Sequence, residues 1–317
     1  METARTVLEN YQVRKTKKQK NEFIGYVERF SKENGYSTRV EKAPFGARNI
    51  VVGDPDRAKV VYTAHYDTCP RLPFPNFITP KSFTIYFLYQ LALTLGIFAV
   101  AFVIGFGIGF GMTVLGDALG WTAPLTDAII DLTSKAVFVG FLLLLFCGPA
   151  NKHTANDNTS GVVTLLEIMK GMPEEKRENA AFIFFDLEEM GLFGSSGYAS
   201  KHKGLKKDKL LLNFDCVSDG NNILFALKKG AKPHKALLEK YFAGNELFNV
   251  EILDKGVFYP SDQASFNCGV GVAALKYSKK LKTLYMDKIH TEKDTVFEIR
   301  NIEFLASRAV TMASEME

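Results

Sequence analysis

Metal-capable side chains follow three apolar segments of the sequence, each at the point where a β-strand is expected to end. His65 comes directly after Val-Val-Tyr-Thr-Ala, Glu188 and Glu189 come shortly after Phe-Ile-Phe-Phe-Asp, and Asp215 ends Leu-Leu-Leu-Asn-Phe-Asp. Open α/β sheets bind ligands at the edge formed by the carboxyl ends of their parallel strands, so these side chains are expected to gather there. Imidazole and carboxylate groups suit zinc. The pattern therefore predicts a metal site at the edge of a sheet.

Two further acidic residues are candidates for the same site. Asp157 lies in the polar run Thr-Ala-Asn-Asp-Asn-Thr-Ser-Gly, directly ahead of an expected helix. It could cap that helix, or its two carboxylate oxygens could bridge two cations. Asp67 could accept a hydrogen bond from the imidazole nitrogen of His65 that does not bind metal, and so fix the tautomer. His65 alone does not establish a metal site, because a histidine near the end of a strand is more often structural.

Five motifs in the same order resemble those of the M28 family of zinc metallopeptidases, which includes bacterial aminopeptidases. They are H-x-D from His65, A-N-D-N-x-S-G around Asp157, E-E-x-G-L-x-G-S-x-x-Y-A from Glu188, N-x-D ending at Asp215, and H-T-x-x-D-T from His290. They are spread over nearly all of the chain outside residues 82–150. The resemblance implies a zinc exopeptidase-like fold and an enzyme that removes N-terminal residues from peptides.

The resemblance also implies two zinc ions, for which Co²⁺ or Mn²⁺ could substitute because affinity alone does not select the metal. It makes Asp157 the carboxylate that bridges them. His65 and Asp215 would complete one metal position, and Glu189 and His290 the other. The family further places a cis peptide bond directly after the bridging aspartate.

The other roles that the resemblance implies concern proton transfer and support of the site. Glu188 would be the general base, which takes a proton from the attacking water and delivers it to the leaving amine. Asp67 would assist catalysis by orienting the first metal-binding histidine, and Asp262 and Asp294 would support the site from their own motifs. Ile289 departs from the family pattern, because many of its aminopeptidases have a tyrosine there that helps to hold the oxyanion.

Residues 82–150 differ in composition from the rest of the chain. Of 39 basic and 35 acidic residues, only four fall in this segment: Asp117, Asp127, Asp131 and Lys135. Residues 82–116 carry no charge, and a helix of this length, roughly 52 Å at ~1.5 Å per residue, exceeds the ~30 Å hydrocarbon core of a bilayer. A second span is predicted at residues 125–147, with a buried or interfacial helix as the alternative. The prediction is a catalytic domain formed by residues 1–81 and 151–317, with a transmembrane hairpin at 82–150.

The hairpin has consequences for location and partners. Lysine and arginine flank it but are absent between its spans, which predicts an integral membrane protein with the catalytic domain and both termini in the cytoplasm. Because the hairpin joins Asp67 to Asp157, we expect the active site near the bilayer and a short peptide substrate that is apolar or membrane-derived. Gly105 and Gly109 form a GxxxG motif through which two copies could associate. The net charge of +4 is too small to indicate a nucleic-acid partner.

The remaining pattern predicts a mixed, mostly parallel α/β sheet with helices on both faces. Strands are expected at 48–52, 59–64, 180–186, 210–215, 222–227 and 270–277, and helices at 20–34, 160–169, 234–243, 301–313 and just after Gly194. The basic residues between Arg14 and Lys20 are expected to form a solvated start of the first helix, with contact to anionic lipid as the alternative.

Two other functions fit parts of the pattern. A glutaminyl-cyclase-like transferase shares much of the ligand set but uses one zinc, and its aromatic pocket has no obvious counterpart because the only tryptophan, Trp121, lies in the hairpin. A catalytically inactive receptor or scaffold would typically have lost ligands, whereas all of them are present here. Metal content would separate the three functions as two zinc ions, one, or none.

Overall fold

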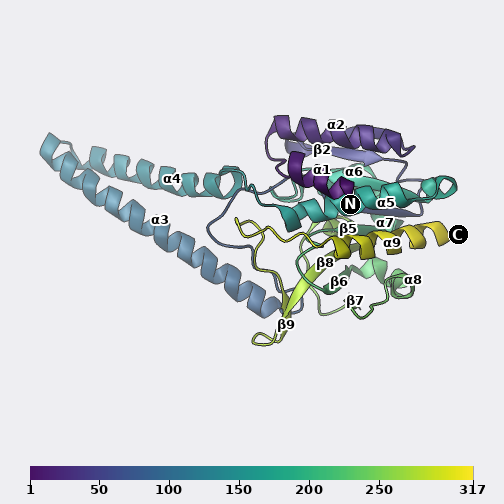
Figure 1. Ribbon diagram of the computed structural model, residues 1–317. Coiled ribbons are helices and arrows are strands. Elements are labelled where there is room, and N and C mark those ends of the chain that lie inside the picture. Colours follow the sequence, from purple (N-terminus) through teal and green to yellow (C-terminus); the bar gives the residue numbers. More distant parts are fainter. Residues whose placement is uncertain (317) are drawn as a thin grey trace. The chain divides into compact units, whose positions relative to one another are not determined.

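The computed structural model describes residues 1–316 and divides into two compact units. The first unit is formed by the chain up to residue 83 and from residue 150 onward, and the second by residues 84–149. The first unit contains a mixed sheet with helices packed on it (Figure 1). This arrangement confirms the predicted α/β class.

The sheet of the first unit has nine strands. They are β1 (Thr38–Lys42), β2 (Arg48–Val52), β3 (Val60–His65), β4 (Ala180–Phe185), β5 (Leu211–Phe214), β6 (Asn222–Leu227), β7 (Asn249–Leu253), β8 (Gly269–Ser278) and β9 (Thr283–Tyr285). Their order is β1-β2-β4-β3-β5-β8-β6-β7, and β9 pairs with β8. The central strands β4, β3, β5 and β8 are parallel, as are β6 and β7, whereas the other neighbouring pairs are antiparallel. The central run therefore brings several strand carboxyl ends to one edge.

Helices cover both faces of this sheet, which explains why its central strands are apolar on both sides. In β4, Phe182 and Phe184 belong to the larger core, while Ile183 and Phe185 belong to the smaller one. The helices of the larger core are α1 (Glu2–Asn10), α2 (Lys17–Glu33), α5 (Gly161–Gly171), α8 (Lys235–Tyr241) and α9 (Ile299–Glu315). Those of the smaller core are α6 (Phe193–Lys201) and α7 (Lys203–Asp208). Short helices connect the elements: η1 (Pro44–Gly46), η2 (Ala155–Ser160), η3 (Glu174–Asn179), η4 (Lys229–His234) and η5 (Asp262–Ser265).

All predicted strands and helices are present, with boundaries shifted by a few residues. The elements that the sequence pattern did not predict, α1, α7, β1, β7 and β9, are short. β1 is an edge strand with exposed or half-buried residues throughout, and it includes the charged pair Arg39 and Glu41. Such a strand shows no apolar alternation, which is the signal that a sequence pattern can detect.

The prediction that the basic residues between Arg14 and Lys20 form a solvated start of the helix expected at residues 20–34 is wrong for two of them. Arg14 is 0% exposed, and its guanidinium donates to the main-chain oxygen of Tyr66 and to Thr159 Oγ1. Lys20 is also buried and forms an ion pair with the buried Asp186. Buried charges are tolerated when they are paired and hydrogen-bonded, and only the tertiary structure supplies these partners.

The second unit consists of two long apolar helices. They are α3 (Phe83–Leu119), which starts at the last residue of the first unit, and α4 (Ala123–Cys147). Both are long and apolar enough to cross a membrane. Asp127, Asp131 and Lys135 stand four residues apart on α4 and form one polar face of that helix. Lys135 and Asp131 form an i,i+4 ion pair of 2.7 Å, which neutralises two of these three charges.

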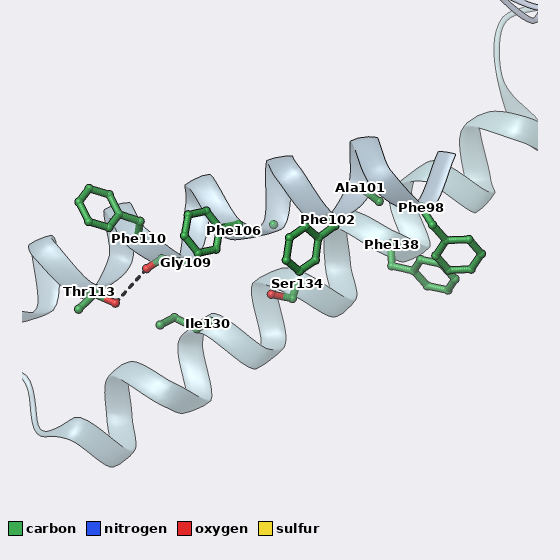
Figure 2. Close-up of a pocket in the computed structure, with 11 residues that line it drawn as sticks. Phe98, Ala101, Phe102, Phe106, Gly109, Phe110, Thr113, Ile130, Ser134 and Phe138 are labelled. Carbon is green, nitrogen blue, oxygen red and sulfur yellow. Dashed lines mark hydrogen bonds between the residues drawn. The ribbon is translucent and has the colours of Figure 1, made fainter. Parts of the chain in front are cut away.

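The glycines of the GxxxG motif lie where α3 faces α4 of the same hairpin. Figure 2 shows Gly109 opposite Ile130, and a Cβ atom at Gly109 would lie 3.4 Å from Ile130 Cγ2. A Cβ atom at Gly105 would lie 3.9 Å from Ser134 Oγ. The small residues thus have a neighbouring helix within one chain, and a second copy is not needed to explain them.

Candidate metal centre

The parallel strands bring the expected ligands to one level at the edge of the sheet. His65 is the last residue of β3 and pairs with Phe185, the last residue of β4. Thr63 pairs with Asn213 on β5, so Asp215, two residues further on, lies level with His65. The loop after β4, which carries Glu188 and Glu189, starts at this same edge of the sheet. The register of the sheet therefore sets the position of the site.

Asp157 lies in η2, which contacts β5: the side-chain amide of Asn158 donates to the main-chain oxygen of Phe214 at 3.0 Å. The Asp294 carboxylate accepts hydrogen bonds from the main-chain N–H groups of Asn156 and Asp157, at 2.9 and 3.0 Å. The peptide bond after Asp157 is cis, as expected. A Cβ atom at Gly161, the first residue of α5, would overlap the main-chain oxygen of Phe214, so only glycine lets the start of this helix approach β5 so closely.

The two oxygens of Asp157 face two separate sets of ligand atoms. Its Oδ1 lies 3.2 Å from His65 Nε2, which lies 3.5 Å from Asp215 Oδ1. Its Oδ2 lies 3.2 Å from His290 Nε2, which lies 3.1 Å from Glu189 Oε2. Ligand atoms around a tetrahedral zinc ion with bonds of about 2.0–2.2 Å lie about 3.3–3.6 Å apart. Both sets are therefore close to the spacing that a cation requires.

The burial of these groups also fits bound cations. The side chains of Asp157, Glu189 and Asp215 are at least nine-tenths buried. Glu189 Oε1 has no hydrogen-bond partner among the described residues, although it is buried. Buried carboxylates that converge in this way need a positive partner, because desolvation alone would neutralise them.

Asp67 supports the site differently from the expected hydrogen bond to His65. The Nδ1 atom of His65 is 3.1 Å from the main-chain oxygen of Asp67 and 3.7 Å from its carboxylate. The carboxylate instead accepts the main-chain N–H groups of Glu188 and Glu189, at 3.0 and 3.3 Å. Leu187, directly before them, has a φ of 54°, which is strained for leucine. The main chain of Asp67 therefore fixes the tautomer of His65, and its side chain fixes the loop that carries both glutamates.

The electrostatics of the site follow from burial and from close charges. Burial raises the pKa of Glu188 well above its usual value, against the lowering effect of His65. Burial also acts to raise the pKa of Asp157, but hydrogen bonds from His290 and His65 outweigh it and hold this pKa below its usual value. Burial lowers the pKa of both histidines, yet the surrounding carboxylates raise it well above its usual value. The free site therefore holds protons that a metal ion would displace.

Asp262 and Asp294 lie beside the site as buried carboxyl groups. Asp262 begins η5, is 0% exposed, and has no hydrogen-bond partner for either oxygen among the described residues. Burial raises its pKa to about 7. Burial and the neighbouring charge of Asp157 likewise raise the pKa of Asp294 to about 7.

Comparison with known proteins identifies the family of this chain. Peptidase family M28 matches residues 137–313, which is more than half of the sequence. The chain belongs to this family. This M28 chain is 34% identical over 97 residues to a probable leucine aminopeptidase 2 of Aspergillus oryzae, covering 27% of this chain and 20% of that protein. It is 41% identical over 68 residues to aminopeptidase YwaD of Bacillus subtilis, covering 20% of this chain and 14% of that protein. The chain thus spans only a fifth or less of these curated relatives.

Solved structures of other proteins share the α/β fold of this chain. A Zn-dependent exopeptidase from Parabacteroides distasonis matches 99% of this chain and 98% of its own, with a TM-score of 0.58 and 14% identity. A glutaminyl cyclase from Bacteroides thetaiotaomicron matches 100% and 98%, with a TM-score of 0.57 and 15% identity. Because exopeptidases and cyclases share this fold, the likeness does not distinguish their activities.

One metal-capable residue of the M28 chain was missed by the sequence analysis. Cys69 lies in a group with Asp157, Glu189 and His290, and one ligand atom from each of the four lies within 4.8 Å of the others. The sequence signal for this residue is its place four residues after His65. Residue spacing alone does not reveal this group, because the neighbours of Cys69 in space are distant in the chain.

Proposed function

We propose that the chain is a two-zinc aminopeptidase. The observation that carries the proposal is that opposite oxygens of Asp157 face two separate ligand sets. His65 and Asp215 would hold one zinc ion with Asp157, and Glu189 and His290 would hold the other. A single-zinc cyclase would not need a second complete set. The aminopeptidase names of the sequence relatives support the same assignment.

Glu188 would be the general base of this reaction. Bound zinc ions supply Lewis acidity, which polarises a carbonyl and acidifies water. Burial raises the pKa of Glu188, which makes its carboxylate a stronger base for accepting a proton from water and returning it to the leaving amine. The Asp67 carboxylate holds the main chain at Glu188 and so positions this group.

We also propose that α3 and α4 anchor the enzyme in a membrane, with the first unit in the cytoplasm. The chain leaves the hairpin through residues next to the site, because Ala150 pairs with Pro70 and the N–H of Asn151 donates to the main-chain oxygen of Cys69. This connection supports a short, apolar or membrane-derived peptide substrate. Replacing residues 72–149 by a short loop should then reduce turnover of apolar peptides, and unchanged kinetics would refute this part. Association of two copies through Gly105 and Gly109 stays a prediction.

The first test combines metal content with substrate form. Zinc per chain is measured in detergent, together with hydrolysis of a leucyl peptide with a free or an acetylated N-terminus, by the wild type and by Glu188→Gln. Two zinc ions and cleavage of the free-amine form alone, lost in the variant, are expected. One zinc ion with cyclisation of an N-terminal glutamine would favour a cyclase, and a chain without bound metal would favour a scaffold.

A further inference from the structure

Cys69 is fixed beside the second set of ligands. Its side chain is 0% exposed, and its main-chain oxygen accepts a hydrogen bond of 3.1 Å from the N–H of Asn151. The Cys69 Sγ atom and one ligand atom each of Asp157, Glu189 and His290 all lie within 4.8 Å of one another. The Cys69 Sγ atom therefore lies beside the metal position that the other three residues form.

The number and type of these atoms match the four protein ligands that a zinc ion can take. Zinc in such sites takes four ligands, with bonds of about 2.3 Å to sulfur and about 2.0–2.2 Å to nitrogen and oxygen. Asp157, Glu189 and His290 supply three of them, with oxygen-to-nitrogen distances of 3.2 and 3.1 Å. The buried Glu189 Oε1 atom, which has no hydrogen-bond partner among the described residues, is a second sign that a cation belongs there.

The other buried cysteines lie in different surroundings. Cys216 Sγ donates to Asp215 Oδ1 at 3.1 Å, beside the first ligand set. Cys268 Sγ lies within hydrogen-bond distance of the main-chain oxygen atoms of Lys207 and Gly230, at 3.4 and 3.3 Å. Neither of these two cysteines belongs to a group of metal-capable residues among the described part of the chain. Cys268 therefore serves as the matched control for Cys69, and Cys216 tests whether a thiol beside the first ligand set gives the same signal.

We propose that Cys69 is a fourth protein ligand of the second metal ion, so that this position is Cys-Asp-Glu-His while the first is His-Asp-Asp. The inference rests on the proposed two-zinc centre. On binding, the sulfur–metal bond forms and the thiol proton is released to solvent. A thiolate is a soft ligand, so the second position selects Zn²⁺, Co²⁺ or Cd²⁺ over Mn²⁺ and Mg²⁺. The two metal positions thereby differ in the cations that they accept.

The test is titration of the metal-free full-length protein in detergent with Co²⁺. Visible d–d bands report binding, and a sulfur-to-cobalt charge-transfer band in the near ultraviolet reports a thiolate ligand. The wild type is expected to show both, with the charge-transfer band belonging to one of two equivalents. Cys69→Ser should keep d–d bands, lose the charge-transfer band and bind one zinc ion at least about tenfold more weakly. Cys268→Ser should behave like the wild type, and Cys216→Ser, which alters the hydrogen bond to Asp215, should keep the charge-transfer band.

Several results would separate the failure of this proposal from failure of the proposed function. Two bound Co²⁺ ions without a charge-transfer band would refute the role of Cys69 and leave the metal centre standing. A band that is lost in Cys216→Ser but kept in Cys69→Ser would also overturn it. A protein that binds no Co²⁺ would refute the two-metal centre and the role of Cys69 together. X-ray absorption of the zinc-loaded wild type needs no substitution, and it should show one sulfur neighbour per two zinc ions.

Discussion

Replacing Arg14 by methionine should destabilise the first unit strongly, although the residue lies in a basic segment that looks solvent-exposed in the sequence. The guanidinium donates to the buried main-chain oxygen of Tyr66 and to that of Tyr11. Arg14→Met would leave both acceptors without this donor, at about 1–3 kcal/mol each. The sum is about 2–6 kcal/mol, and 4 kcal/mol corresponds to a fall in Tm of roughly 8–16 °C for a domain of about 150–250 residues.

The same change should weaken the metal centre, because Arg14 also donates to Thr159 in the loop that holds Asp157. The assay is thermal unfolding of the full-length protein in detergent, followed by near-ultraviolet circular dichroism, together with zinc affinity by chelator competition. Lys17→Met is the matched control, because it removes an equal charge from an exposed position of the same segment. Equal Tm values for the two variants would refute the view that Arg14 joins the N-terminal segment to the site.

Three further predictions concern the site and its supports. Gly161→Ala should lower both Tm and zinc affinity, because its Cβ atom would overlap the main-chain oxygen of Phe214, whereas Gly204→Ala, with open space around it, should leave both nearly unchanged. In the metal-free protein, the pKa of Asp262 is about 7 when folded and ~3.9 when unfolded, so its contribution to stability falls as pH rises from about 4 to about 7. Asp262→Asn should make that slope shallower by up to about 1.4 kcal/mol per pH unit, measured as Tm against pH in chelator, and an unchanged slope would contradict this assignment. Because the charge of Asp262 raises the pKa of Glu188, the same variant should also move the acidic limb of kcat/KM to lower pH, and a shift to higher pH would contradict the role of Glu188 as base.

The candidate ligands could be predicted because each lies in a short sequence motif, such as the end of an apolar strand. His65 and Asp215 end apolar strands, and the parallel register then places them at the same level. The charge-free segment from residue 82 likewise predicts a long apolar helix, since no partner is needed to recognise it. Edge strands such as β1 escaped prediction because an exposed strand has no apolar alternation.

The sequence alone determined the types and order of the candidate ligands and the two apolar helices, because strand ends and apolar runs are local properties of the chain. Only the tertiary structure decided which groups meet across it. It buried Arg14 and Lys20 against partners more than fifty residues away, turned the Asp67 carboxylate toward the glutamate loop, and brought Cys69 beside His290. These pairings depend on loop paths and on desolvation, and neither is encoded in the spacing of residues along the chain.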